Sequence, residues 1–385
     1  VQLLNVLIRQ GKRILVSSHS NNAVDKILLE ADKAKYLDGV EALRYGEIYS
    51  PELSRYYTRY KLSCLVRSNP DRFSNRQEVT NFLLSNSQVV FATQVAIMKE
   101  EIFKLFWNNR FDYVFIDEAS QCPFVACLMP ISIGKKVILS GDHKQISPSL
   151  NLDRNQFGGA ARLISGFGGE FGGGLGAIKD EVYRQSLFER LITNEEKRTR
   201  GTVGGSSLSV MLNLQYRMNE SIARVSCDRF YNKQLGSGRQ NARITLVDLL
   251  KKRKTSVDAS LIDVSCPMMW INHKFQEKSE QKHLSNEEEI KILIHLLREL
   301  TEGMRFEFKD IGIITPYNRQ RELLDQYIRS NLRGEKNQWR DLDISTIDSY
   351  QGREREIVIF SAVRCNVKQD CGFLVSCFRG EERCE

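Results

Sequence analysis

The sequence predicts an α/β protein with two domains, each a doubly wound and mainly parallel sheet. Short apolar runs alternate with helical stretches along both halves of the chain. Each apolar run of the first half ends in a cluster of polar residues. The length of 385 residues is enough for two ordinary domains. The predicted domains cover residues 1–207 and 208–385.

The first half is expected to begin with an amphipathic helix over residues 1–8, which ends at Gly11, and a second helix is expected over 23–29. The predicted strands are residues 14–16, 88–93, 113–116 and 136–142. In open parallel sheets, ligands bind at the carboxyl ends of the strands. We therefore expect the polar residues after each strand to share one edge of the sheet.

The apolar run at residues 113–116 ends in two adjacent acids, Asp117 and Glu118. A run without polar alternation is typical of a buried central strand. Two carboxylates there suit magnesium–nucleotide chemistry, in which one holds the metal and its neighbour orients and deprotonates a water. A solvated acidic strand end would explain these two residues if they stood alone.

Residues 151–207 break this pattern. Nine glycines lie between Gly158 and Gly176, a composition that cannot form a packed core. We expect a flexible insertion over about 151–182, then a helix over 185–191 and a second loose stretch over 197–205.

The second half returns to alternating strands and helices. The predicted strands are 211–214, 244–247, 310–314, 343–346 and 357–362, and the predicted helices are 219–233, 286–300 and 317–330. A basic run at 251–254 is most often a solvated loop. Tyrosines and arginines interleave at 55–60, which would suit base stacking or, more simply, a solvated helical face.

The composition indicates the class of partner and the compartment. A net charge of +8 favours a polyanionic partner. The nine cysteines include no Cys-x-x-Cys pair, which fits a reducing, intracellular compartment, nucleus or cytoplasm. The spacing of Cys365, Cys371, Cys377 and Cys384 matches no usual zinc site. No apolar run approaches membrane-spanning length, so no membrane partner is expected.

Several short segments, taken in order, resemble the motifs of superfamily 1 helicases. The nearest group holds the nonsense-mediated-decay helicase, senataxin, the immunoglobulin-mu-binding helicase and the replication helicase–nuclease. The segments are residues 17–25, 92–93, 117–121 (DEASQ), 141–145 (GDHKQ), 215–218 (QYRM), 315–318 (TPYN) and 346–354 (TIDSYQGRE). The resemblance extends from residue 1 to about 374 and implies two tandem RecA-like domains.

The resemblance implies ATP and Mg²⁺ as cofactors. Asp117 would hold the Mg²⁺ through bound waters, and Glu118 would polarise the attacking water. Gln145 would reach the γ-phosphate, and Arg217 would stabilise charge in the transition state. In that family the arginine crosses from the second domain to a nucleotide bound by the first, which couples hydrolysis to domain closure.

Further contacts are implied for the nucleotide and for a single strand of RNA or DNA. Tyr216 would offer a ring to the adenine, and Glu354 would bind the ribose. The full set of implied nucleotide contacts is Asp142, Tyr216, Gly352 and Glu354. The implied contacts to the nucleic-acid backbone are Ser18, Asn21, Thr93, Thr315 and Thr346. Ordinary helix N-capping would also explain the polar residues at 17–22.

Two motifs of the family are missing from these 385 residues. The phosphate-binding loop, Gly-x-x-x-x-Gly-Lys-Ser/Thr, occurs nowhere, although the family places it just before the helix that opens this chain. Residues 371–374 match the start of the last motif, but 375–385 do not continue it. We therefore expect a fragment, truncated before Val1 and aberrant at its end, that is inactive by itself.

The function predicted for the whole protein is the motor core of an ATP-dependent helicase or translocase on single-stranded nucleic acid, moving 5′ to 3′ by resemblance. One alternative is an ATPase that remodels ribonucleoprotein without unwinding, which a strand-displacement assay would separate. Another is a non-catalytic nucleic-acid-binding fragment of a broken gene, which an intact upstream transcript would exclude. No protein partner is predicted.

Overall fold

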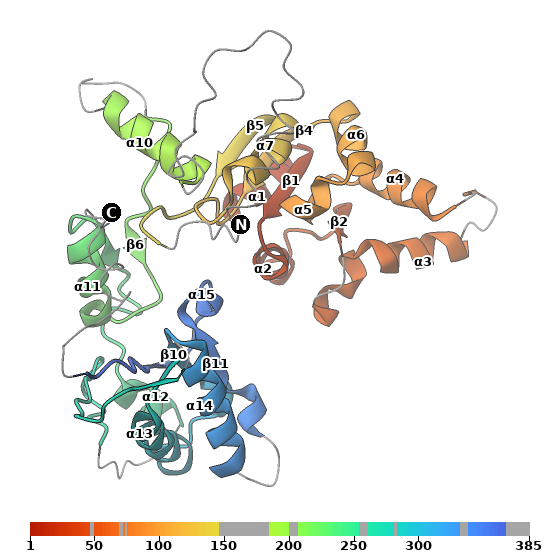
Figure 1. Ribbon diagram of the computed structural model, residues 1–385. Helices are drawn as coiled ribbons and strands as arrows, with labels where there is room; N and C mark the ends of the chain where they lie inside the picture. The colour runs from red at the N-terminus through yellow and green to blue at the C-terminus, as the bar shows by residue number, and fades with distance from the viewer. Residues whose placement is uncertain are drawn as a thin grey trace. The chain divides into compact units, whose positions relative to one another are not determined.

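A computed structural model gives the structure of this chain. It describes residues 1–46, 50–68, 72–73, 75–145, 185–199, 207–253, 261–280, 283–331 and 338–366. The chain divides into two compact units, Val1–Val210 and Met211–Glu385. Figure 1 labels the elements of both units.

The first unit is built on a five-stranded sheet in the order β2–β3–β1–β4–β5 (Figure 1). All neighbouring strands are parallel. The strands are β1 Ile14–Ser18, β2 Ala42–Tyr45, β3 Val89–Thr93, β4 Phe111–Ile116 and β5 Gly134–Leu139. Because the strands run the same way, their carboxyl ends share one edge, as predicted.

Helices connect these strands and cover both faces of the sheet. They are α1 Gln2–Arg9, α2 Asn21–Lys33, the 3₁₀ turn η1 Pro51–Tyr56, α3 Thr58–Ser68, α4 Arg76–Asn86, α5 Gln94–Ile97, α6 Glu100–Asn108, α7 Phe124–Ser132 and α10 Leu187–Thr199. Ile14 and Val16 pack in one apolar cluster with Leu28 of α2. Leu15, between them, packs in another cluster with Phe106 of α6. This alternation confirms the doubly wound α/β fold.

Strand β2 was missed in the sequence prediction because a charged residue, Arg44, stands in its middle. The side chain of Arg44 is fully buried. Its Nε donates to Asp25 Oδ1 at 2.6 Å, and Tyr57 donates its hydroxyl to the other oxygen of Asp25 at 2.6 Å. A charge becomes compatible with a buried strand only when such partners are supplied.

The central strand of the sheet is β1, and not the run at 113–116 as predicted. All five residues of β1 are buried, whereas Tyr113 and Phe115 of β4 are only partly buried. Strand β4 lies between β1 and β5, so it is still an interior strand.

The second unit contains a three-stranded parallel sheet in the order β11–β10–β12 and two short pairs. The strands are β6 Leu214–Gln215, β7 Gly236–Ser237, β8 Lys278–Glu280, β9 His283–Ser285, β10 Ile311–Thr315, β11 Asp343–Thr346 and β12 Ile357–Phe360. The parallel pair is β6–β7, and β8–β9 is antiparallel.

Helices and turns connect the strands of the second unit, which has one main apolar cluster. They are α11 Glu220–Phe230, α12 Leu246–Arg253, α13 Glu287–Arg298, the π-helical turn η2 Glu299–Gly303, the 3₁₀ turns η3 Phe308–Asp310 and η4 Gln338–Asp341, α14 Asn318–Asn331 and α15 Ile347–Tyr350. Ile313 of β10 and Leu324 of α14 meet in this cluster.

Two predicted strands of the second half were wrong in whole or in part. The strand predicted at 244–247 leads instead into helix α12, because Asp248 accepts from both the N–H and the hydroxyl of Thr245. Such local bonds favour a helix start over a strand. Of the strand predicted at 211–214, only Leu214 belongs to β6.

The basic run at 251–254 was wrongly predicted as a loop. Lys251, Lys252 and Arg253 form the last turn of α12, where positive charge complements the helix dipole. Arg253 also bonds Asp310 at 2.9 Å and Glu356 at 2.6 Å. Lys254 lies outside the described residues.

Three predictions fall on residues that the structure does not describe: the insertion at 151–182, the aberrant tail at 375–385, and the cysteines at 371, 377 and 384. Within the described ranges, no cluster of three or more histidine, cysteine or acidic side chains is arranged to hold a metal ion. None of the helices in the same ranges is long and apolar enough to cross a bilayer.

Candidate functional sites in the two units

Asp117 and Glu118 lie where β4 ends, at the carboxyl edge of the first sheet. The N–H of Asp117 donates to the carbonyl of Ser17 at 2.9 Å, so the acid is fixed beside the central strand. Its carboxylate is partly buried and has no hydrogen-bond or ion-pair partner among the described residues. Such a hard oxygen donor fits Mg²⁺, which binds to one or two carboxylates and completes its shell with water and phosphate.

Glu118 adopts a left-handed backbone with φ 51°, which is uncommon outside glycine. The residue begins a tight turn in which the N–H of Gln121 donates to the carbonyl of Glu118 at 3.0 Å. The Gln121 side-chain amide donates to Glu118 Oε2 at 2.8 Å. The turn therefore orients the Glu118 carboxylate, as a group that positions water requires.

Asp142 and Gln145 follow β5 at the same edge. Asp142 accepts from the N–H of Lys144 at 3.0 Å and from the Gln145 amide at 2.9 Å. A Cβ at Gly141 would lie 2.9 Å from the backbone nitrogen of Ser120, so only glycine fits against the Glu118 turn. Ser120 Oγ accepts from the N–H of Asp142 at 3.2 Å, which ties the two turns together. The sequence analysis overlooked this role of Ser120.

The residues predicted to contact nucleic acid in the first unit lie near this edge, in different environments. Ser18 is fully buried, and its hydroxyl has no partner among the described residues. Asn21 accepts from Arg44 Nη2 at 2.8 Å, so its side chain takes part in the buried network around Arg44. Thr93 caps α5 by accepting from the N–H of Ala96 at 3.3 Å.

The second unit repeats this arrangement with different residues. Thr315 ends β10, is fully buried, and has no partner for its hydroxyl among the described residues. Thr346, its register partner on β11, caps the short helix α15. Ser18 and Thr93 stand in the same relation on β1 and β3. In each unit, a buried hydroxyl therefore lies beside a capping threonine at the carboxyl edge.

A pocket of about 370 Å³ in the second unit is lined by two of the predicted nucleotide contacts, Tyr216 and Glu354, and by Arg217, which was predicted to be catalytic. We call it the Tyr216 pocket. Arg217 Nε donates to Glu354 Oε2 at 2.9 Å across 137 residues of sequence. The remaining lining residues are Asn241, Lys309, Asp310, Arg355 and Glu356. Gly352, close by in sequence, has φ 78°, where a side chain would be strained.

Gln215 holds the turn that presents Tyr216 and Arg217 and was not predicted as a site residue. Its side-chain oxygen accepts from the N–H groups of Arg217 and Met218, both at 2.8 Å. Its amide donates to the carbonyl of Met218 at 2.7 Å and to Ser237 Oγ at 2.6 Å. One partly buried amide therefore holds the turn on both sides.

Gly238 and Asn241 were also missed and fix the Tyr216 ring and backbone. A Cβ at Gly238 would lie 2.2 Å from Cε1 of Tyr216, so the ring needs glycine there. The Asn241 side chain donates to the carbonyl of Tyr216. The Gly-Ser-Gly sequence at 236–238 was the only signal, and it reads equally well as an ordinary turn.

Tyr350 lies against the sheet of the second unit and holds helix α15. A Cβ at Gly312 of β10 would lie 2.6 Å from the Tyr350 hydroxyl, so ring and backbone are in close contact. Burial raises the pKa of Tyr350 above its ordinary value. The residue is structural, although it lies within the 346–354 motif.

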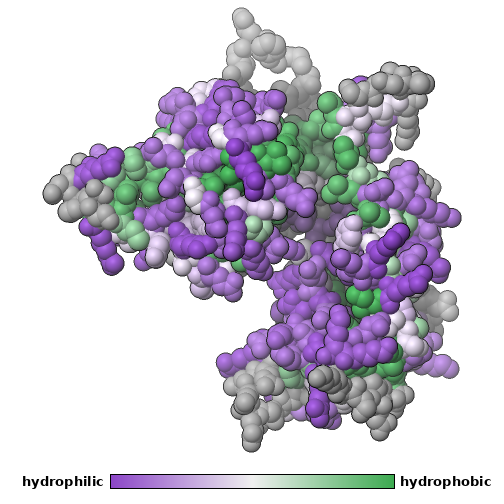
Figure 2. Space-filling view, turned by 180° about the vertical axis from the view of Figure 1, so that it is seen from behind, coloured by the Kyte–Doolittle hydropathy of each residue, from purple (hydrophilic) through white to green (hydrophobic). Residues whose placement is uncertain are grey.

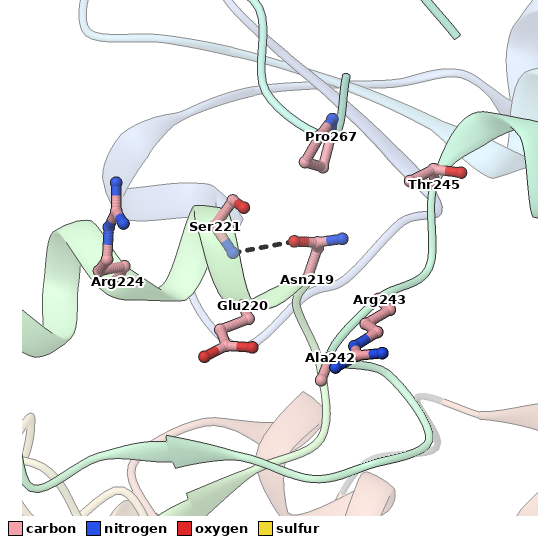
Figure 3. A pocket seen from close by; sticks show the side chains of 8 residues that line it. All are labelled: Asn219, Glu220, Ser221, Arg224, Ala242, Arg243, Thr245 and Pro267. Atoms are coloured by element: carbon pink, nitrogen blue, oxygen red, sulfur yellow. Dashed lines mark hydrogen bonds between the residues drawn. The ribbon is translucent and has the colours of Figure 1, made fainter. Parts of the chain in front are cut away.

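A second pocket, of about 330 Å³, lies at the amino end of α11 (Figure 3). It holds none of the predicted residues. The backbone N–H groups of Glu220 and Ser221 already donate to Ala242 and to the Asn219 side chain, at 2.9 and 2.8 Å. Both N–H groups are therefore occupied, and the pocket lining combines the carboxylate of Glu220 with the guanidinium groups of Arg224 and Arg243.

The tyrosine–arginine run at 55–60 mostly serves the fold. Tyr56 and Tyr57 are buried, and Arg55 pairs with Asp32. Only Tyr60 presents a half-exposed ring. The base-stacking interpretation is therefore wrong for Tyr56 and Tyr57. Elsewhere, hydrophilic residues cover most of the visible face of each unit in Figure 2, with smaller hydrophobic areas between them.

Two protein families match parts of this chain. One family described as an AAA domain matches residues 183–379, and another with the same description matches residues 58–151. The chain is 29% identical to the DNA polymerase alpha-associated DNA helicase A of Schizosaccharomyces pombe, over 96% of this chain and 47% of that protein.

Two further relatives are also named as helicases. An uncharacterized ATP-dependent helicase of Methanocaldococcus jannaschii is 31% identical over 84% of this chain and 40% of its own length. The DNA replication ATP-dependent helicase/nuclease DNA2 of Xenopus laevis is 28% identical over 98% of this chain and 32% of its own length. The chain thus spans less than half the length of each of these relatives.

Proposed function

Since this chain belongs to the AAA-domain helicases of superfamily 1, in the group of the nonsense-mediated-decay helicase, we propose that it forms the motor core of an ATP-dependent helicase or translocase. The two RecA-like domains of this motor are residues 1–207 and 208–385. The motor binds a single strand of nucleic acid and moves along it from 5′ to 3′.

The Tyr216 pocket is the observation that carries this proposal. An aromatic ring, an arginine and a carboxylate from segments 137 residues apart line one pocket of nucleotide size. A half-exposed tyrosine ring can stack on a base, a guanidinium can neutralise phosphate oxygens, and a carboxylate can accept from ribose hydroxyls. These three functions match the three parts of ATP.

The carboxyl edge of the first sheet supports the hydrolytic part of the proposal. Asp117 is the residue that would hold Mg²⁺, which neutralises phosphate charge when bound. Glu118, oriented by its turn and by Gln121, accepts a proton from the attacking water. Gln145 follows β5 at the same edge of the sheet and bonds Asp142, and a side-chain amide there can respond to a phosphate.

The strand ends support the nucleic-acid part. Buried hydroxyls without a partner are costly, and Ser18 and Thr315 each carry one at a carboxyl edge. We propose that the hydroxyl and N-cap groups of Ser18, Asn21, Thr93, Thr315 and Thr346 contact the backbone phosphates. Because the names of the Schizosaccharomyces pombe and Xenopus laevis relatives refer to DNA, we propose single-stranded DNA as the first substrate, with RNA as the second.

The test uses a form of the protein that also carries a phosphate-binding loop, here called the loop-bearing form. Its ATP hydrolysis should rise when single-stranded DNA is added. It should separate a partial duplex with a 5′ overhang better than one with a 3′ overhang. A rate of ATP hydrolysis that changes with neither DNA nor RNA would contradict the proposal. Stimulated hydrolysis without strand separation would favour a remodelling ATPase.

Residues 1–385 by themselves should not hydrolyse ATP. The lysine and backbone amides of a Gly-x-x-x-x-Gly-Lys-Ser/Thr loop hold the β- and γ-phosphates, and this motif occurs nowhere in the chain. Turnover stimulated by single-stranded nucleic acid in purified 1–385 would refute this statement.

A further inference from the structure

The segment 353–356, between α15 and β12, carries four charges of alternating sign: Arg353, Glu354, Arg355 and Glu356. Glu354 lines the Tyr216 pocket and bonds Arg217, whereas both arginines bond elsewhere. The segment has no regular backbone structure of its own. Its side-chain contacts therefore decide where Glu354 points.

Both arginines bind to one carboxylate, that of Asp343 at the start of β11. Arg353 Nη1 lies 2.8 Å from Asp343 Oδ1, and Arg355 Nη2 lies 3.1 Å from Asp343 Oδ2. The Asp343 side chain is 5% exposed. Ser345 donates its hydroxyl to the same oxygen as Arg353, at 2.7 Å.

The two arginines flank Glu354 on either side. Because one buried carboxylate accepts a hydrogen bond from Arg353 and forms an ion pair with Arg355, the intervening residue is fixed from two directions. Arg355 Nη1 also donates to the carbonyl of Glu354 at 2.9 Å. The next residue, Glu356, is held by Arg253 at 2.6 Å. Glu354 is thus the member of the run that is left to face Arg217.

We propose that Asp343 is a positioning residue for the nucleotide site: through Arg353 and Arg355 it holds Glu354 toward the ribose and toward Arg217. The inference rests on the proposed nucleotide site. The sequence offered no sign of it, since Asp343 lies 11 residues before Glu354 and looks like an ordinary strand residue.

The charge of Asp343 is the essential feature. An asparagine has a similar shape and keeps one oxygen acceptor, but it leaves two neighbouring guanidinium groups without a counter-charge. We expect the segment 353–356 to move and Glu354 to lose its fixed place. The part of the ADP affinity that comes from the contact of Glu354 with the ribose should then be lost, while the ring of Tyr216 still binds the base.

The experiment measures sugar discrimination with the 385-residue chain. Dissociation constants for ADP, 2′-deoxy-ADP and 3′-deoxy-ADP are obtained by titration calorimetry, or by saturation-transfer NMR for weak binding. The wild type should prefer ADP to at least one deoxy analogue. Asp343→Asn should weaken ADP binding by about tenfold and bring the ratio of ADP to deoxy-ADP affinities close to one. Glu354→Ala should do the same.

The double variant separates positioning from a general structural effect. If Asp343 acts through Glu354, Asp343→Asn adds nothing in a Glu354→Ala background. Asp325→Asn is the matched control, because it breaks an exposed aspartate–arginine pair on α14 and should leave every constant unchanged. Should Asp343→Asn fail to fold, Arg353→Gln replaces it, since the Asp343–Arg355 pair then remains.

The possible outcomes are distinct. If Glu354→Ala loses sugar discrimination but Asp343→Asn and Arg353→Gln keep it, the positioning role is refuted and the nucleotide site stands. If the losses of ADP affinity caused by Asp343→Asn and Glu354→Ala add up in the double variant, the positioning role is also refuted. If the wild type binds no ADP, or Glu354→Ala binds like the wild type, the proposed nucleotide site itself fails.

Discussion

Glu118 combines an unusual backbone with the chemistry expected of a general base. Its φ is 51°, and the side-chain amide of Gln121 holds its carboxylate. Asp117, one residue earlier, continues the strand geometry and keeps its carboxylate available. Two adjacent acids thus acquire two different roles because the chain turns between them.

Glu118→Gln in the loop-bearing form should lower the rate of ATP hydrolysis by on the order of 10²–10⁴-fold. Glutamine keeps the shape and can still bond Gln121, but it cannot take a proton from water. ATP affinity should stay near that of the wild type. Steady-state hydrolysis and equilibrium ATP binding check both parts, and Glu52→Gln, at an exposed carboxylate of η1, serves as the control. Near-normal turnover would show that Glu118 is only structural.

Gly238→Ala should weaken ADP binding by about tenfold without unfolding the second unit. The new methyl group would lie 2.2 Å from Cε1 of Tyr216 and would displace the ring from the pocket. Calorimetric titration with ADP measures the effect. Gly236→Ala is the matched control, because its methyl group would lie 3.3 Å from a Leu214 methyl, which can shift, and 3.6 Å from the carbonyl oxygen of Asn213, an ordinary contact distance. Equal effects of the two changes would exclude a role for the ring.

At the scale of elements, strand β2 depends on a buried ion pair. Arg44 pairs with Asp25 of α2, and Tyr57 bonds the same aspartate. The Nη1 of Arg44 also donates to the carbonyl of Tyr45 at 2.6 Å. The network joins β2, α2 and the segment before α3. Asn21 belongs to it, so the first turn of α2 is fixed by the same arginine.

Arg44→Ala should destabilise the first unit by about 3–5 kcal/mol, because it leaves the Asp25 carboxylate buried without a counter-charge. Arg55→Ala breaks an exposed pair with Asp32 and should cost below about 1 kcal/mol. Urea unfolding followed by circular dichroism compares the two variants. A loss for Arg44→Ala no larger than for Arg55→Ala would contradict the structural role of the buried pair.

Helix α10 is linked to the segment after it by Glu195. The bonds from Arg198, together with that from the N–H of Leu208 at 2.7 Å, lower the pKa of Glu195 to about 2 from an ordinary value of 4.5. Because the folded pKa is the lower one, the stabilisation is complete above the ordinary value and disappears as the pH falls toward 2.

Glu195→Gln should therefore reduce the stability of the first unit at about pH 6, and its effect should shrink as the pH falls through about 4 and toward 2. Urea midpoints of wild type and variant across this range test the prediction. A direct NMR titration of the Glu195 carboxyl group is the independent check. A difference that stays constant with pH would show that the carboxylate is not held by these bonds.

At the scale of the whole molecule, both units carry the same arrangement of polar residues at the carboxyl ends of their strands. A parallel sheet ends its central strand in a buried hydroxyl, and the neighbouring strand ends in a threonine that caps a short helix. The two halves share no evident sequence repeat. The similarity lies in the arrangement of polar groups at the strand ends, where backbone N–H groups and hydroxyls are concentrated.

The glycine-rich residues 151–182 should be dispensable for ATP hydrolysis. Each doubling of a flexible loop costs only about 0.6 kcal/mol, so a long insertion is tolerated without a function. Replacing it with a short Gly-Ser link in the loop-bearing form should leave the basal rate unchanged. A collapsed rate in a folded protein would refute this prediction. Weaker binding of single strands alone would indicate that Arg162, Lys179 or their neighbours clamp the nucleic acid.

The sequence by itself determined the α/β class, the parallel direction of the strands and the polar edge of the first sheet. It also identified Asp117–Glu118, Gln145 and the Tyr216–Arg217 pair as candidates. These features are local: apolar runs of strand length, polar residues at their ends, and short motifs read in order. Each depends on neighbours within a few residues, so the printed sequence contains the information.

Tertiary structure alone decided the rest. Arg44 is tolerated inside strand β2 only because Asp25 pairs with it and Tyr57 bonds the other oxygen of the same carboxylate. The Arg217–Glu354 pair spans 137 residues. Whether a charge can be buried, and where a side chain points, depends on partners that folding brings together from distant parts of the chain, and no local pattern records them.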